Sequence, residues 1–484
     1  MTARKVAIGM RILCGRAVVA LAVMALMAAA LPPPVNFVFS QNPEVGTEPY
    51  SSAVGDFNRD GIPDIAVTNY ASDSVSLLFG RGDGTFQPAV PIPAGVEPTG
   101  IVASDLNGDQ ILDLIVCNAG TPQVLVYIGN GDGTFKSPVT YISGSSPREP
   151  VVADFNGDGI PDFATANVVS NNVSVFLGKG DGTFAPARNF AVLGTNPKSV
   201  VAGDLDGDGK VDLVTCNDLS GNVSVLIGNG DGTFQTAVTY PAGAGVRDLA
   251  LADLKRDGIP DIVTANGDAF NISILFGKGD GTFQNPVNYP TGGSPRSIAV
   301  MDYNGDGIPD LAVSAYNASV VNVLLGNGDG TFVSGRTIKT GQQPTSVRAA
   351  DFNRDGKPDL VVTIGGRTIL QNYVTILLNT PLSLSPTSLT FPSQTVGTTS
   401  AYQSVTLTNI GNAPLNLTGF SLTGADPGDF SEVTNCGTSL AVAARCTVRV
   451  TFSPGVTGSR SASLSLSDAA PASPQIVTVQ GTGF

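Results

Sequence analysis

Most of the chain consists of short apolar segments separated by turns rich in glycine, aspartate and asparagine. A representative stretch has such segments at 199–203, 213–217, 223–227 and 234–240. Each of them either alternates apolar with polar residues or is continuously apolar, which is typical of β-strands bounded by turns. The pattern therefore predicts an all-β protein built from many short strands.

One unit of this pattern repeats along the chain. An aspartate-rich nonapeptide recurs every 49 or 50 residues, and a Gly-Asp-Gly-Thr-Phe turn follows each of the first six copies. Repeats of this length with four strands each are typical of propeller blades, in which radial packing buries both faces of every small sheet. A linear solenoid is the main alternative. The copies begin at Asp56, Asp105, Asp154, Asp204, Asp253, Asp302 and Asp351.

The ends of the repeat array favour a closed ring. The seventh copy supplies only three strands, which end at Leu378, and no Gly-Asp-Gly-Thr-Phe turn follows them. An apolar segment at 36–40 precedes the first copy and leads into a Gly-x-x-Pro turn at Gly46, as the fourth strands of the other copies do. We expect this N-terminal strand to complete the last blade of a seven-bladed β-propeller over residues 36–380.

The nonapeptides carry the strongest chemical signal. Carboxylate or amide oxygens occupy positions 1, 3, 5 and 9, and a glycine at position 6 of most copies permits a sharp turn. With the backbone carbonyl of position 7, these are hard oxygen ligands in one tight loop, as Ca²⁺ requires. The predicted ligands are Asp56, Asn58, Asp60, Ile62 and Asp64; Asp105, Asn107, Asp109 and Asp113; Asp154, Asn156, Asp158, Ile160 and Asp162; Asp204, Asp206, Asp208, Lys210 and Asp212; Asp302, Asn304, Asp306, Ile308 and Asp310; and Asp351, Asn353, Asp355, Lys357 and Asp359.

Two copies depart from the pattern. Copy 2 has Gln110 at position 6, so we expect weaker binding there, and copy 5 has Lys255 at position 3, where an ammonium replaces the cation. An EF-hand is excluded, because position 12 lies inside a predicted strand instead of supplying an acidic ligand. Turns that are merely rich in aspartate and asparagine are the alternative, although carboxylates gathered in one loop repel each other without a cation.

The loops, their flanking strands and the Gly-Asp-Gly-Thr-Phe turns resemble the FG-GAP repeats of integrin α-subunit propellers and of bacterial proteins with VCBS-type repeats. The resemblance covers about residues 36–380. It implies Ca²⁺ on one face, between the first and second strands of each blade, and ligand contacts usually on the opposite face. Members of the family include adhesion proteins, lectins and a few lyases or lipases, so the fold alone does not determine the function.

A second candidate site lies at the turn that enters each first strand. Four consecutive copies have a basic residue at one equivalent position, where the other copies have tyrosine or threonine. First strands of a propeller start near its axis, so these cations are expected to form a crescent around one mouth of the channel and to attract carboxylates or sulfates, such as acidic sugars. Basic residues that are merely scattered over the surface are the alternative. The predicted ligand residues are Arg148, Lys198, Arg247 and Arg296.

Composition limits the possible chemistry. The chain contains no histidine and no tryptophan, which excludes Ser/His/Asp and Cys/His nucleophilic sites and zinc sites with histidine ligands. Its formal net charge of −14 argues against a broad basic face for nucleic acid. We therefore expect a binding protein that is not an enzyme and has no nucleic-acid partner.

The first 31 residues have the pattern of a signal peptide. A basic segment with Arg4, Lys5, Arg11 and Arg16 precedes an apolar segment at 17–31, and small residues at 28–30 offer a cleavage site. The apolar segment is too short to span a bilayer comfortably. We expect export to the medium or the cell surface, with no membrane span after cleavage.

The repeat disappears at Pro381, where alternating strands rich in serine, threonine, leucine and valine begin. This pattern predicts an immunoglobulin-like β-sandwich over 381–484. Cys436 and Cys446 are predicted to form a disulfide, since both lie in an exported β-domain. Segments 388–391, 409–412 and 479–483 resemble the choice-of-anchor D or HYDIN-like immunoglobulin-like family, whose domains usually act as spacers or partner contacts.

These features are compatible with three functions. The leading hypothesis is a monomeric, calcium-binding adhesion or recognition module whose partner is an extracellular protein or glycan. The second is a carbohydrate-binding lectin. The third is a polysaccharide-processing enzyme that uses Ca²⁺ with Arg, Lys, Tyr or Asp side chains. The sequence does not identify an individual ligand.

Overall fold

The computed structural model describes residues 35–366, 369–410, 414–468 and 474–484. The predicted signal peptide at 1–31 lies outside the described residues. Within the described ranges, no helix is long and apolar enough to cross a membrane. Strands make up the regular structure there, apart from one short 3-10 helix, η1 (Pro427–Asp429). The prediction of an all-β protein is confirmed.

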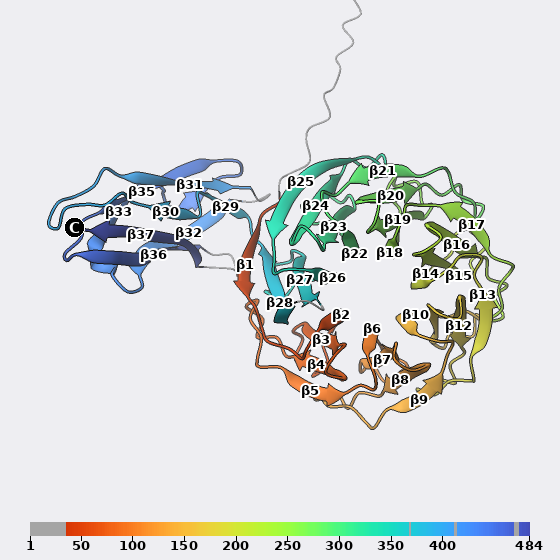
Figure 1. Ribbon diagram of the computed structural model, residues 1–484. Helices are drawn as coiled ribbons and strands as arrows, with labels where there is room; N and C mark the ends of the chain where they lie inside the picture. Colours follow the sequence, from red (N-terminus) through yellow and green to blue (C-terminus); the bar gives the residue numbers. More distant parts are fainter. Residues whose placement is uncertain (1–34, 367–368, 411–413, 469–473) are drawn as a thin grey trace, which may run out of the picture. The chain divides into compact units, whose positions relative to one another are not determined.

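Seven four-stranded antiparallel sheets are arranged radially, with the first strand of each innermost (Figure 1). Blades 1 to 3 are β2 (Pro49–Gly55), β3 (Asp64–Asn69), β4 (Ser74–Leu78) and β5 (Val90–Pro93); β6 (Pro98–Ser104), β7 (Asp113–Asn118), β8 (Gln123–Tyr127) and β9 (Val139–Ile142); and β10 (Pro147–Ala153), β11 (Asp162–Asn167), β12 (Asn172–Phe176) and β13 (Arg188–Ala191). Blades 4 to 6 are β14 (Pro197–Gly203), β15 (Asp212–Asn217), β16 (Asn222–Leu226) and β17 (Val238–Pro241); β18 (Val246–Ala252), β19 (Asp261–Asn266), β20 (Asn271–Leu275) and β21 (Val287–Pro290); and β22 (Pro295–Met301), β23 (Asp310–Ala315), β24 (Val320–Gly326) and β25 (Phe332–Lys339).

The seventh blade is built from both ends of the repeat array. Its three inner strands are β26 (Pro344–Ala350), β27 (Asp359–Gly366) and β28 (Ile369–Asn379), and its outermost strand is β1 (Phe37–Gln41). β1 is antiparallel to β28, with Phe37 opposite Asn379. The N-terminal strand therefore completes the last blade as predicted, and the ring excludes a linear solenoid.

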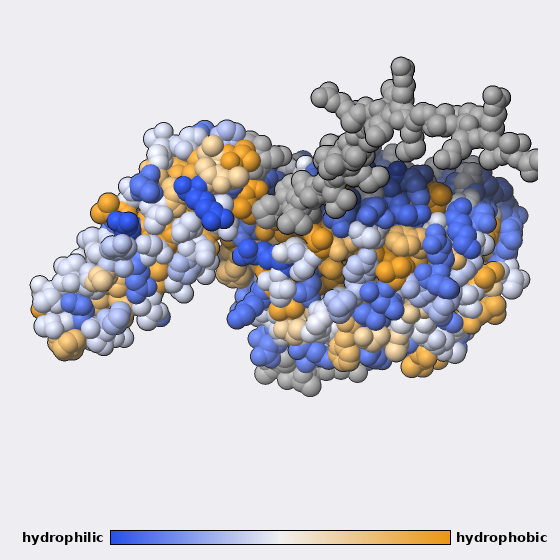
Figure 2. Space-filling view, turned by 90° about the horizontal axis from the view of Figure 1, so that it is seen from above, coloured by the Kyte–Doolittle hydropathy of each residue, from blue (hydrophilic) through white to orange (hydrophobic). Residues whose placement is uncertain are grey.

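The hydrophobic core lies between neighbouring blades. All six residues of the second strand β15 are buried, whereas three of the four residues of the outer strand β17 are exposed. One buried cluster combines Phe155 and Val175 of blade 3 with Leu213 of blade 4. In Figure 2, hydrophobic residues are scattered among hydrophilic ones over the visible surface, as is common on protein surfaces. Radial packing therefore buries the inner strands and leaves the outer strands in contact with solvent.

The fourth strand is shorter than the pattern predicts. A strand over 234–240 is expected, but β17 begins only at Val238. Phe234 forms an isolated bridge with Gly228 that closes the preceding turn, and its ring centroid lies 5.8 Å from that of Phe155 in blade 3. The predicted start is wrong because Phe234 continues the apolar pattern of the strand although it packs between blades.

The Gly-Asp-Gly-Thr-Phe turn of one blade is hydrogen-bonded to the aspartate loop of the blade before it. The amide of Gly232 donates to the carbonyl of Phe155 at 3.0 Å. Gly232 has a φ of 75°, in the left-handed region that glycine adopts without strain. Equivalent bonds join Gly84 to Phe352, Gly133 to Phe57 and Gly281 to Leu205. The turns and the aspartate loops therefore lie at the same end of the propeller.

Two sheets form the C-terminal β-sandwich. One contains β29 (Leu382–Ser385), β31 (Gln403–Asn409), β35 (Arg445–Phe452) and β33 (Phe430–Thr434), and the other contains β30 (Ser388–Thr390), β37 (Gln475–Gly483), β36 (Gly458–Asp468), β32 (Leu415–Thr423) and β34 (Ser439–Leu440). Buried residues of both sheets, such as Val448 and Leu464, form its core. Cys436 and Cys446 are joined in a disulfide with 5.0 Å between their Cα atoms, which confirms the predicted pairing.

Candidate functional site

The loop between β10 and β11 shows the geometry of the predicted metal loops. Oδ1 and Oδ2 of Asp154 accept hydrogen bonds from the amides of Asp158 and Gly159 at 3.2 and 2.8 Å. Asn156 Oδ1 accepts one from the Asp158 amide at 3.1 Å, and Asp158 Oδ1 accepts one from the Ile160 amide at 2.8 Å. These bonds fold the chain so that the side-chain oxygens of positions 1, 3 and 5 gather on one tight turn.

The aspartate at position 9 has a different environment. Asp162 is buried, and its Oδ2 and Oδ1 accept hydrogen bonds from the amides of Phe155 and Gly178 at 2.9 and 2.7 Å. Burial raises the pKa of the equivalent Asp212 to about 6 and that of Asp310 to about 7. This carboxylate therefore ties the loop to the end of the third strand, and a cation nearby would favour its ionised form.

Blade 4 brings three carboxylates together. Ligand oxygens of Asp204, Asp206 and Asp208 all lie within 4.8 Å of one another. Hard oxygen donors this close fit a divalent cation such as Ca²⁺, so this group can hold a metal. The other predicted sets lie in equivalent loops between first and second strands, at 56–64, 105–113, 154–162, 302–310 and 351–359. Metal binding by those sets stays a prediction.

Copies 2 and 5, which depart from the nonapeptide pattern at Gln110 and Lys255, keep the conformation of the other loops. Gln110 adopts a φ of 63°, and its amide donates to Asp105 Oδ2 at 2.8 Å, although this region is unfavourable for residues other than glycine. In blade 5, Lys255 Nζ donates to Asp257 Oδ2 at 2.7 Å. An ammonium in that position competes with a divalent cation for the same carboxylate.

The aspartate loops and the four predicted basic residues lie at opposite ends of the first strands. β14, for example, begins at Pro197, next to Lys198, and ends at Gly203, directly before Asp204. Because a strand rises about 3.3 Å per residue, the two ends are about 20 Å apart. The propeller therefore carries two separate candidate sites, one at each end.

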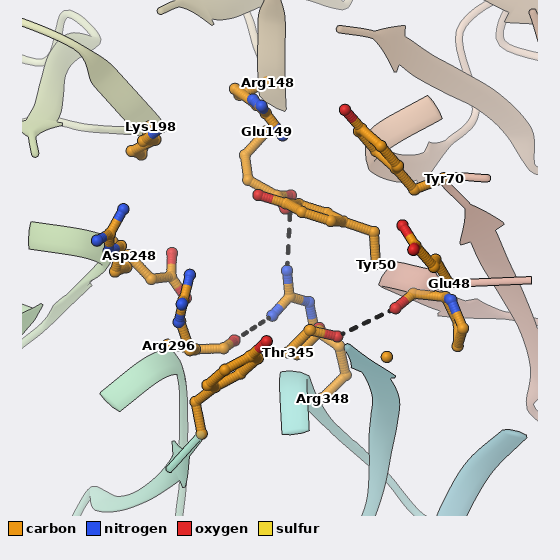
Figure 3. A pocket seen from close by; sticks show the side chains of 16 residues that line it. Glu48, Tyr50, Tyr70, Arg148, Glu149, Lys198, Asp248, Arg296, Thr345 and Arg348 are labelled. Atoms are coloured by element: carbon orange, nitrogen blue, oxygen red, sulfur yellow. Dashed lines mark hydrogen bonds and ion pairs between the residues drawn. The ribbon is translucent and has the colours of Figure 1, made fainter. Parts of the chain in front are cut away.

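A cavity of about 360 Å³ lies at the end with the basic residues (Figure 3). We call it the axial pocket, because its lining comes mainly from the innermost strands of the ring. Arg148, Lys198, Arg247 and Arg296 all line it, so the structure brings the predicted crescent together, while its ligand role stays a prediction. Its volume is within the usual range for small-molecule sites. The equivalent Tyr50 and Thr345 also line the pocket.

Two of the four cations have carboxylate partners. Arg247 Nη1 donates to Asp218 Oδ2 at 2.6 Å, and Lys198 Nζ lies 3.6 Å from the same oxygen. Arg247 Nη2 is also 3.4 Å from Oδ1 of the exposed Asp268. Burial lowers the pKa of Lys198 to about 8, and Arg148 adds to this effect. This side of the pocket is therefore partly neutralised.

The other two cations lie against tyrosine rings. The Arg148 guanidinium carbon is 5.3 Å from the centre of the Tyr50 ring, and that of Arg296 is 4.3 Å from the centre of the Tyr316 ring. Within the described ranges neither arginine has a carboxylate within salt-bridge distance, and the Nε atom of each is buried without a hydrogen-bond partner. Arg148 and Arg296 are therefore the cations with free capacity for an anionic ligand.

Sequence reasoning missed four charged residues of the axial pocket, Glu48, Glu149, Asp248 and Arg348. Glu149 and Asp248 directly follow Arg148 and Arg247, and strict alternation sends consecutive side chains to opposite faces. However, the pairing of β10 with β11 and that of β18 with β19 are irregular at these positions. Such irregularity breaks the alternation, so both residues of each pair reach the same pocket. A basic residue followed by an acidic one, found in two copies, was the available signal.

Two exposed apolar side chains lie close in sequence to the carboxylates that pair with Arg247. Leu219 directly follows Asp218, and Phe270 is two residues from Asp268, the two carboxylates that pair with Arg247. Both apolar side chains are exposed. Neither of them is among the residues that line the axial pocket.

Both the propeller and the C-terminal sandwich match known protein families. A family described as FG-GAP-like repeat matches residues 56–116, 105–165, 154–215, 204–264, 253–313 and 302–362. A HYDIN/CFA65/VesB-like, Ig-like domain matches residues 381–482. No curated protein matches the chain.

Several solved structures are similar at low identity. BBS1N, solved in complex with ARL6DN, has a TM-score of 0.52 at 12% identity over 71% of this chain and 96% of that one. An Agrocybe aegerita lectin that recognises non-reducing terminal N-acetylglucosamine has a TM-score of 0.46 at 21% identity over 61% and 81%. The V. cholerae biofilm matrix protein Bap1 has a TM-score of 0.37 at 13% identity over 71% and 91%. At these identities the likeness concerns the fold alone.

Proposed function

This chain belongs to the FG-GAP-like repeat family, and from that premise we propose that it is an exported, calcium-binding recognition module that binds an acidic glycan in the axial pocket. One observation carries the proposal. Arg148 and Arg296 line the same pocket, and no carboxylate among the described residues pairs with either of them. Guanidinium groups bind carboxylates and sulfates through paired hydrogen bonds.

Electrostatics favour this end of the molecule for an anion. The chain has a formal net charge of −14, so a pocket with several cations is a local exception on an acidic protein. Such an exception focuses potential and draws anions to it. The Tyr50 and Tyr316 rings beside the arginines suit a ligand with an apolar ring face as well as a charge, which is the character of a sugar acid.

The aspartate loops have a separate, structural role in this proposal. Ca²⁺ supplies positive charge among the loop carboxylates at the end opposite the pocket, and the loops hold neighbouring blades through the Gly-Asp-Gly-Thr-Phe turns. The ring then keeps the first strands, and with them the pocket, in a fixed arrangement. The C-terminal sandwich serves as a spacer or partner contact at the cell surface or in the medium.

A pair of matched double variants tests the pocket. Arg148→Ser with Arg296→Ser removes the two free cations, and Arg188→Ser with Arg336→Ser removes two exposed cations from the outer strands of the same blades. Binding to an array of neutral, uronic and sulfated glycans is measured at two salt concentrations. We expect salt-sensitive binding to acidic glycans by the wild type and by the outer-strand variant, and its loss in the pocket variant.

Three results would overturn the proposal. They are equal binding by both double variants, binding only to neutral glycans, and cleavage of an acidic glycan by the wild type. Cleavage would assign the pocket to an enzyme instead of a recognition module. Retained metal content and melting temperature in the pocket variant would show that lost binding does not reflect unfolding.

A further inference from the structure

Three carboxylates line the axial pocket, those of Glu48, Glu149 and Asp248. Glu149 and Asp248 each directly follow an arginine in a first strand, and these two are held differently. Oδ1 of Asp248 accepts a hydrogen bond from the Leu249 amide at 2.9 Å, and Oδ2 accepts one from the Ile298 amide at 3.1 Å. Both oxygens of Asp248 are therefore engaged by the backbone. Asp248 holds the first strands of blades 5 and 6 together.

Glu149 has weaker partners. Its Oε2 accepts a hydrogen bond from Ser51 Oγ at 3.4 Å. The same oxygen lies 3.7 Å from Arg348 Nη2 (Figure 3). Both distances are long for hydrogen bonds to a charged group. Within the described part of the chain, no group donates to Oε1. Of the two carboxylates that directly follow an arginine, Glu149 is therefore the one that can still accept hydrogen bonds.

Arg348 satisfies Glu149 only in part, because the other terminal nitrogen of its guanidinium group is held elsewhere. Its Nη1 donates to Ser297 Oγ at 3.1 Å and to the Val347 carbonyl at 3.0 Å. The Glu149 side chain is only 21% exposed, and burial raises the pKa of its carboxyl group. A carboxylate this poorly solvated gains from a ligand that donates hydrogen bonds and loses from a ligand that adds negative charge.

Building on the proposed binding of acidic glycans, we propose that Glu149 makes the axial pocket selective for uronic acids over densely sulfated sugars. The single carboxylate of a uronic acid pairs with Arg148 or with Arg296, and its ring hydroxyls donate to Oε1 of Glu149. A sulfated sugar replaces hydroxyl donors with anionic acceptors. Glu149 repels these, so it discriminates against the wrong ligand while it binds the right one.

The test uses the full chain in Ca²⁺ and two probes, oligogalacturonate and heavily sulfated dextran of similar length. Dissociation constants are measured at constant ionic strength. Glu149→Gln removes the charge but keeps the shape of the side chain, and Glu44→Gln is the matched control on an exposed glutamate that does not line the axial pocket. We expect the wild type and Glu44→Gln to prefer the uronate. Glu149→Gln should shift the ratio toward the sulfated probe by roughly 10- to 100-fold.

A second measurement needs no variant of the protein. Oligogalacturonate with acetylated hydroxyls keeps its carboxylates but cannot donate to Glu149. We expect the wild type to bind it roughly tenfold more weakly than the unmodified oligomer, because one hydrogen bond to a charged group is lost. Unchanged affinity for this probe would overturn the selective role of Glu149.

The failures of the two proposals are distinguishable. If the wild type binds neither probe, the proposed function fails and the inference about Glu149 fails with it. If the wild type binds both probes and Glu149→Gln leaves their ratio where Glu44→Gln does, acidic glycan binding stands and the selectivity of Glu149 is refuted.

Discussion

The ring of Phe135 packs edge-on against the ring of Phe57, with 6.1 Å between their centroids. Phe57 occupies position 2 of the aspartate loop of blade 1, and Phe135 ends the Gly-Asp-Gly-Thr-Phe turn of blade 2. The Gly133 amide of that turn also donates to the Phe57 carbonyl at 3.0 Å. The predicted metal loop and the interface between blades thus share a residue, so we expect metal binding and blade packing to be coupled.

Phe57→Ala should destabilise the propeller strongly. Phe57 is almost fully buried, and truncation of a buried phenylalanine costs about 3–5 kcal/mol. Phe270→Ala changes a half-exposed phenylalanine and should cost less than about 1 kcal/mol. Calorimetric melting of the two variants in Ca²⁺ compares these costs. Similar melting temperatures would contradict a central role for the interface between blades.

Removal of metal should lower the melting temperature of the wild type. Ca²⁺ that binds only the folded state stabilises it by roughly 2.7 kcal/mol for each site at a free concentration of 100 Kd. Melting is followed in chelator, and again after Ca²⁺ is restored. We expect a reversible decrease. A melting temperature that does not respond to chelation refutes structural Ca²⁺ in the loops.

Asp158→Ala should remove one metal ion per chain. Asp158 lies at position 5 of the blade 3 loop, where its carboxylate is one of the predicted ligands. Asp181→Ala is the control in the same blade. Asp181 accepts a hydrogen bond from the Thr183 hydroxyl in the Gly-Asp-Gly-Thr-Phe turn and is not a predicted metal ligand. Metal content is measured by elemental analysis after gel filtration. Equal content in the two variants argues against ligation by Asp158.

Lys255→Asn should create a metal site in blade 5. The change replaces the ammonium that lies 2.7 Å from Asp257 Oδ2 with the amide oxygen found at position 3 of most other copies. We expect one additional Ca²⁺ per chain and a higher melting temperature in Ca²⁺ than in chelator, by a larger margin than in the wild type. If the metal content does not increase, Lys255 is not what prevents binding in that loop.

Binding of acidic glycans should weaken as the pH rises from 7 to 9. Burial lowers the pKa of Lys198 to about 8, with Arg148 and Arg247 adding to the decrease and Asp218 opposing it. Lys198 is therefore a cation below this pH and is neutral above it. Lys198→Arg stays charged throughout, so its affinity should change less. Parallel pH profiles would exclude Lys198 as the titrating group.

The lowered pKa of Lys198 also makes the free energy of unfolding depend on pH. The pKa of Lys198 in the folded chain is lower than its ordinary value of 10.5, so the unfolded chain binds more protons between these two values. The contribution of Lys198 to the free energy of unfolding therefore rises with pH over that interval. Glycan binding and stability consequently respond to pH in opposite directions through this one residue.

The repeat made much of the fold predictable. The spacing of the nonapeptides determined seven blades, and the missing fourth strand after Leu378 identified 36–40 as the closing strand. Local chemistry was sufficient for this, because each blade uses the same turns and the same alternation. The start of the fourth strand could not be predicted, because Phe234 continues the apolar pattern of the strand although it packs between blades.

For the candidate site, the sequence by itself determined where the oxygen-rich loops lie and that four basic residues share one position near the axis. Only the tertiary structure decided that Asp218 neutralises Lys198 and Arg247, that Arg148 and Arg296 lie unpaired against tyrosines, and that Glu149 faces the same pocket. The physical reason is that the contacts of Arg247 with Asp218 and of Arg148 with Tyr50 join different blades, and that the place of Glu149 depends on an irregular strand register. The contacts of Lys198 with Asp218 and of Arg296 with Tyr316 lie within one blade, but their partners are not repeated in every copy, so the periodicity does not encode them either.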